Sequence, residues 1–163
     1  MSAAVDATKT YLRAGSYTVT LAVTDKDGGT GANSLNVSVA RQSVQAMALP
    51  GIINLNDRGQ SGVDVALLSG PGFDPASVNP ETATIGGVGL DIHGGGDKLS
   101  YHYEDLNHDG VADVVLRFGR AALIDAAALK SASTELLLLA DLRNGVQIEG
   151  RAPIETHVIG KTN

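Results

Sequence analysis

The sequence predicts an all-β protein, an antiparallel β-sandwich preceded by a β-hairpin, with at most one or two short helices. Two observations carry this prediction. The 163 residues include 20 glycines, few Lys and Glu, and many Thr, Val, Asn and Ser, a composition that favours strands and turns. Short runs of alternating hydrophobicity also recur along the chain, separated by Gly, Pro and Asn turn signals. The hydrophobic fraction of 43% is sufficient for a buried core.

Two alternating runs near the N-terminus predict the hairpin, one on each side of a turn at residues 25–29. The polar positions of both runs are mostly Thr, Asn and Ser, so we expect one face to be solvated and the other half-buried. The residues expected on the buried face are Tyr17, Val19, Leu21, Val23, Leu35, Val37 and Val39.

Residues 14–29, AGSYTVTLAVTDKDGG, resemble the closing half of a PKD (polycystic kidney disease) repeat, which ends in G-x-Y-x-V-x-L-x-V-x-D-x-x-G. The resemblance covers residues 7–40 and implies an immunoglobulin-like sandwich in an extracellular protein. The opening half of such a repeat, with its Trp and its F-G-D-G turn, is missing. We therefore expect a partial PKD-like segment at 1–42, a sandwich domain at 43–163, immunoglobulin-like or jelly-roll-like, and a fragment of a longer secreted or cell-surface protein.

The second part begins with expected strands at 44–49, 51–55 and 62–69. Pro75 and Pro80 predict a helical turn or loop, since proline cannot donate to a sheet ladder. A short strand at Thr82 to Ile85 and a glycine-rich loop at 86–97 follow.

The remaining segments alternate between strands and turns. Residues 98–104 and 112–118 predict strands around an acidic loop, and the Ala-rich stretch 121–130 predicts a short helix. Residues 134–142 are apolar on both faces, which predicts a doubly covered central strand. Asn144-Gly145 predicts a type I′ hairpin turn. The strands expected to complete the sheet are 146–150 and 156–159.

The acidic loop between two of these strands reads DLNHDGVAD, residues 105–113. Acidic and amide side chains stand at positions one, three, five and nine, glycine at six, and Val111 at seven, where a backbone carbonyl serves in calcium loops. Position twelve, which is Leu116, departs from the EF-hand pattern of a bidentate acid. The alternative is an ordinary hairpin loop whose acids accept backbone amides.

The loop resembles the calcium loops of dockerins and FG-GAP repeats, and its strand-loop-strand setting is closer to the latter. The resemblance implies Ca²⁺ as the cofactor, with a ligand in place of Leu116 coming from water or from an acid elsewhere in the fold. The ligands that it implies are the side chains of Asp105, Asn107, Asp109 and Asp113 and the carbonyl of Val111.

Charge and composition restrict the function classes. The formal net charge of −6 and the absence of Lys/Arg runs argue against nucleic acid as a partner, and no apolar run approaches the ~20 residues of a membrane helix. The chain has no Cys, so disulfides and cysteine nucleophiles are excluded. The histidines do not stand at zinc-ligand spacing, and no nucleophile-base pair is visible.

Two functions remain open at this point. The first is a non-catalytic, calcium-binding β-sandwich module of a bacterial-type secreted or surface protein, acting as a spacer or in adhesion to an extracellular protein. The second is an accessory polysaccharide-binding domain of an extracellular hydrolase. Such a domain needs exposed aromatic side chains, and the candidates for sugar contact are Tyr101, Tyr103 and His102. The two tyrosines share one strand face and His102 lies on the other. Core or cross-strand packing of the two tyrosines is the alternative.

Overall fold

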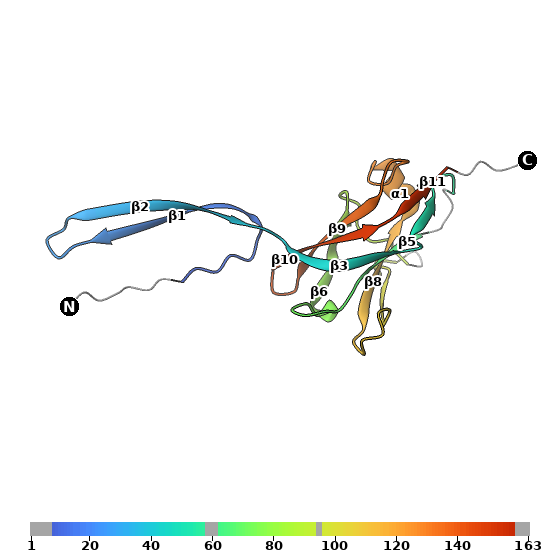
Figure 1. Cartoon of the computed structure of the whole chain (residues 1–163), viewed down its shortest axis with the longest axis horizontal. Helices are drawn as coiled ribbons and strands as arrows, with labels where there is room; N and C mark the ends of the chain where they lie inside the picture. Colours follow the sequence, from blue (N-terminus) through green and yellow to red (C-terminus); the bar gives the residue numbers. More distant parts are fainter. Residues whose placement is uncertain (1–7, 58–61, 94–95, 159–163) are drawn as a thin grey trace, which may run out of the picture. The chain divides into compact units, whose positions relative to one another are not determined.

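A computed structural model describes residues 8–57, 62–93 and 96–158 (Figure 1). It shows an all-β, sandwich-like protein, as the composition and the alternating runs predict. The chain divides into two compact units, residues 1–41 and 42–163. The boundary expected from the sequence, between residues 42 and 43, lies one residue further along the chain.

In its described residues, unit 1 contains one antiparallel hairpin of β1 (Gly15–Thr24) and β2 (Thr30–Val39), paired along the full length of both strands. The turn between them uses Gly28 at a φ of 86°. The Asp25 carboxylate accepts the backbone N–H groups of Asp27 at 2.9 Å and Gly29 at 2.7 Å. Asp25 therefore stabilises the turn, as Asp commonly does.

The alternation of the hairpin produces two chemically different faces. The expected half-burial is confirmed for Tyr17, Val19, Val37 and Val39 but is wrong for the three residues nearer the turn. Leu21, Val23 and Leu35 are 60%, 59% and 67% exposed. Period-two alternation places side chains on one face, whereas burial requires a second layer, and unit 1 holds one two-stranded layer in its described part.

Unit 2 is built on a seven-stranded sheet with the order β6-β9-β10-β3-β5-β8-β7, together with a small parallel pair of β4 and β11. Its strands are β3 (Gln42–Leu49), β4 (Ile52–Asn54), β5 (Gly62–Leu67), β6 (Val78–Ile85), β7 (Tyr101–Glu104), β8 (Asp113–Gly119), β9 (Glu135–Leu142), β10 (Gln147–Pro153) and β11 (Glu155–His157). Residue 159, expected at the end of the last strand, lies outside the described residues.

Strand β3 joins the two halves of this sheet. Residues 42–45 pair in parallel with β10, and residues 46–49 pair antiparallel with β5. Each half of the strand therefore belongs to a different half of the sheet. Side chains of both halves, such as Leu138 and Ile148 on one side and Leu116 and Phe118 on the other, belong to one buried hydrophobic cluster. This is the sandwich-like arrangement.

Strand β6 begins at Val78, earlier than the expected start at Thr82, so Pro80 lies inside the strand. Proline was expected to prevent pairing here. The register between β6 and β9 shifts between Asn79 and Thr84, and β6 is an edge strand of the seven-stranded sheet. An irregularity at an edge is where a strand accommodates a residue without an N–H donor. The preceding 3₁₀ turn, Pro75–Ser77, agrees with the expected helical turn.

Two expectations around β9 are also corrected. Its buried and half-buried residues alternate, so Leu137 and Leu139 are only half-buried and the strand is not covered on both faces. The following turn is not type I′, since only Gly145, at φ 87°, has a positive φ. The Gly145 N–H donates to the Leu142 carbonyl at 2.8 Å, which indicates a type I turn followed by a left-handed glycine.

Helix α1 (Arg120–Asp125) is shorter than the Ala-rich stretch suggested. It ends in a Schellman motif: the N–H of Ala128 donates to the carbonyl of Leu123, and that of Ala127 to Ile124. Ala127 takes the left-handed position at φ 56°. Within the described residues, none of the helices has the length and apolar character needed to span a membrane.

Candidate metal centre

The acidic loop connects β7 to β8 at one end of the seven-stranded sheet. The two strands are antiparallel, and the pair Glu104 and Asp113 closes the loop. The setting is therefore strand-loop-strand. Leu116, at position twelve, is fully buried in the core and cannot approach the loop centre.

The loop folds around its own side-chain oxygens. The Asp105 carboxylate accepts the N–H groups of Asp109 at 3.2 Å and Gly110 at 3.1 Å, and Asp109 accepts the N–H of Val111 at 2.8 Å. His108, at φ 59°, and Gly110, at φ 87°, supply the left-handed backbone that this tight path needs. Two carboxylates are thereby oriented by backbone amides rather than left to repel each other.

Ser69, just after β5, is a site residue that sequence reasoning missed. Its hydroxyl donates to Asp109 Oδ2 at 2.5 Å, and the Asn107 amide donates to the same oxygen at 3.0 Å. Ser69 and Asp109 are 40 positions apart, so no local pattern indicates the contact. Donation from Ser69, and secondarily from the Val111 amide, lowers the pKa of Asp109 below its ordinary value, which keeps the carboxylate ionised.

Asp113 occupies a different environment from the other acids of the loop. It is fully buried, and its Oδ1 accepts the N–H of Ser69 at 2.7 Å. Its Oδ2 accepts the N–H groups of Leu106 at 2.8 Å and Asn107 at 3.3 Å. Both oxygens are thus engaged by backbone amides, and Asp113 holds the loop against the end of β5.

The structure therefore separates the predicted ligands into two groups. Asp105, Asn107 and Asp109 line the loop, and Val111 is an exposed residue of its rim, while Asp113 lies beneath them. In the part of the chain that the structure describes, no three His, Asp or Glu side chains form a metal-binding group. The predicted donors other than Asp113 are two carboxylates, one amide and a backbone carbonyl, all oxygen groups of the kind that Ca²⁺ accepts.

Two of the four histidines contact acids of their own strands. His102 Nε2 lies 3.5 Å from Glu104, and His157 Nε2 lies 3.0 Å from Glu155. Tyr101 and Tyr103 are not core residues, since they are 40% and 43% exposed. Their rings meet edge to face, with centroids 6.1 Å apart. Burial in the core therefore does not account for these tyrosines.

Fold and loop together define an all-β, sandwich-like protein. Its acidic loop connects β7 and β8, the two strands at one edge of the seven-stranded sheet. Comparison with known protein families, with curated proteins and with solved structures gives no match.

Proposed function

We propose that the chain is a non-catalytic, calcium-stabilised β-sandwich module of a secreted or cell-surface protein, acting as a spacer or adhesion module. The observation that carries the proposal is the β7–β8 loop, where Asp105, Asn107 and Asp109 converge on a short stretch of backbone. In this proposal these three side chains and the Val111 carbonyl hold the ion. Asp113 fixes the loop from below through its amide bonds.

The ion would act on stability. A ligand that binds only the folded state raises the free energy of unfolding by RT ln(1 + [L]/Kd), about 2.7 kcal/mol at one hundred times Kd. The loop connects an edge strand to β8, and Ser69 ties it to β5, so ordering it would stabilise three neighbouring strands. Millimolar calcium outside the cell suits the weak sites of extracellular modules.

Calorimetric titration of Ca²⁺ into chelator-treated protein, with thermal melts alongside, tests the proposal. We expect one site and a melting temperature raised by several degrees. Asp105→Ala/Asp109→Ala should abolish both effects, because it removes both carboxylates of the set. The matched control Asp25→Ala/Asp27→Ala, in the β1–β2 turn, should retain both.

A variant of Asp113 distinguishes the structural role of the loop from ion binding. Asp113→Ala should lower stability by about 3 kcal/mol even in chelator, since it leaves three amides without their acceptor. No binding heat and an unchanged melting temperature in the unmodified protein would defeat the calcium proposal.

A further inference from the structure

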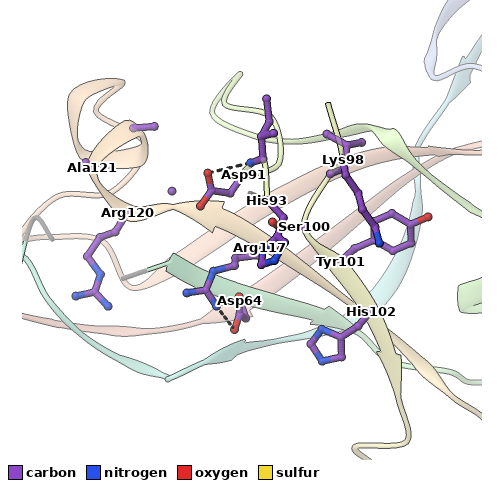
Figure 2. Close-up of a pocket in the computed structure, with 14 residues that line it drawn as sticks. Asp64, Asp91, His93, Lys98, Ser100, Tyr101, His102, Arg117, Arg120 and Ala121 are labelled. Atoms are coloured by element: carbon purple, nitrogen blue, oxygen red, sulfur yellow. Dashed lines mark hydrogen bonds and ion pairs between the residues drawn. The ribbon is translucent and has the colours of Figure 1, made fainter. Parts of the chain in front are cut away.

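A groove with a volume of about 940 Å³ opens beside the edge of the sheet formed by β5, β8 and β7. This volume lies in the range of ~300–1,000 Å³ that is usual for small-ligand sites. Figure 2 shows its lining, with Asp64 and Arg117 paired across β5 and β8, and Lys98, Ser100 and Tyr101 around them. None of the acidic-loop residues lines it.

The charged groups of the groove balance one another. Asp64 and Asp91 line it together with Arg117 and Lys98, two negative charges and two positive ones. Arg120 also lines the groove, but its guanidinium is directed away from the Asp64–Arg117 pair (Figure 2) and binds Asp57 at 2.8 Å. A balanced lining gives little preference for a strongly anionic or cationic ligand.

The groove nevertheless has free hydrogen-bonding capacity. The Arg117 guanidinium reaches both Asp64 oxygens through Nη1, at 3.3 Å each, and its other two nitrogens, Nε and Nη2, have no partner in the described residues. The same holds for the ammonium of Lys98. The carboxylates of Asp64 and Asp91 can accept further bonds. A ligand that both donates and accepts at closely spaced positions satisfies this lining, and sugar hydroxyl groups do both.

An exposed aromatic ring completes the site. Tyr101 lies at the groove and is 40% exposed, so its ring can contact the apolar face of a sugar. Tyr103 is two positions along the same strand and 43% exposed, but it does not line the groove. The two tyrosines therefore form a matched pair that differs in its relation to the groove.

We propose that this groove binds a neutral saccharide, with the ring of Tyr101 against one sugar unit and the Asp64, Asp91, Arg117 and Lys98 side chains bonded to its hydroxyl groups. The inference goes beyond calcium binding and does not rest on it. It makes the module a carbohydrate-binding one through residues separate from the acidic loop.

The test uses the full chain labelled with ¹⁵N and titrated with cellohexaose, xylohexaose, mannohexaose and chitohexaose, up to about 10 mM, which detects millimolar dissociation constants. We expect at least one of these probes to shift the amides of Asp91, Ser100 and Arg117 in a saturable way. Tyr101→Ala should weaken binding about tenfold, whereas Tyr101→Phe and Tyr103→Ala should stay within about twofold. The spectrum of each variant verifies its fold.

Three results would overturn the inference. The first is no saturable shift with any of the four probes. The second is an equal loss in Tyr101→Ala and Tyr103→Ala, which would remove the groove as the site. The third is binding only of oligogalacturonate or inorganic phosphate, which would make it an anion site. Titrations in calcium and in chelator separate this inference from the calcium proposal, because saccharide binding should persist in both.

Discussion

Ser69 shows how a single residue organises the acidic loop from outside it. Its backbone N–H donates to Asp113 and its hydroxyl donates to Asp109, so one residue contacts both the buried acid and an exposed one. The sequence predicted the loop and its acids because their spacing is local. It did not predict Ser69, because a serine before a glycine reads as an ordinary turn and its partners are brought near only by the pairing of β5 with β8.

The lowered pKa of Asp109 predicts a dependence of stability on pH. A carboxyl whose pKa is lower in the folded than in the unfolded state stabilises the fold above its ordinary value of 3.8, and this contribution is lost as the pH falls through the folded pKa. Ser69→Ala removes the largest cause and should raise the pKa of Asp109 toward 3.8. The difference in free energy of unfolding between the unmodified protein and Ser69→Ala should therefore shrink as the pH falls below 3.8.

The measurement is an NMR titration of the Asp109 carboxyl carbon in chelator, with urea unfolding at neutral and acidic pH. Ser16→Ala, at an exposed serine of β1, is the control and should leave the Asp109 titration unchanged. Identical Asp109 titrations in the unmodified protein and in Ser69→Ala would contradict the assignment of the hydrogen bond.

At the scale of elements, local pattern predicted strand positions better than their burial. Asp113–Gly119 and Gly62–Leu67 lie within one or two residues of the expected ranges, because β-branched residues between turn signals indicate strands. Pro80 in β6 and the half-buried Leu137 and Leu139 of β9 were not anticipated. Edge position and the coverage of each face are set by distant strands, and no local run contains that information.

Gly150 in β10 marks a close approach between the two halves of the sheet. A Cβ atom there would lie 2.7 Å from Leu67 Cδ2 and 2.9 Å from Ala46 Cβ, closer than side chains tolerate. Gly150→Ala should therefore destabilise unit 2 by about 1–2 kcal/mol, since overpacking costs ~1–3 kcal/mol and the less flexible unfolded chain returns ~0.4–1 kcal/mol.

Urea unfolding measures this difference. Gly89→Ala is the matched control, because a Cβ atom at Gly89 meets nothing within 4 Å and the substitution should change stability by less than about 0.5 kcal/mol. Equal stabilities of Gly150→Ala and Gly89→Ala would show that the strands around Gly150 have room to adjust.

At the scale of the molecule, the two units differ in what holds them together. Every residue of the buried cluster belongs to residues 44–154, and the described part of unit 1 is built on a two-stranded hairpin on which Leu21, Val23 and Leu35 are exposed. The chain division could be anticipated from the change of pattern near residue 42. The order of strands in unit 2 could not, because it depends on which runs pair across the whole chain.

This difference predicts the outcome of truncation. A protein of residues 42–163 should unfold with the same midpoint in urea as the full chain, within error, since the buried cluster of the described residues lies entirely within the retained part. Calcium binding should also be retained, because the acidic loop lies within the truncated protein. A midpoint lowered so far that the free energy of unfolding falls by more than about 1 kcal/mol would show that the hairpin supports unit 2.

The split pairing of β3 has a consequence for how the chain is made. Residues 46–49 find their partner in β5 soon after synthesis, but residues 42–45 pair with Ile148 to Arg151, near the C-terminal end of the unit. Because synthesis runs from the N-terminus, residues 42–45 cannot pair with β10 until nearly all of the unit has left the ribosome. Until then, a nascent chain carries an open parallel edge that a neighbouring chain can occupy.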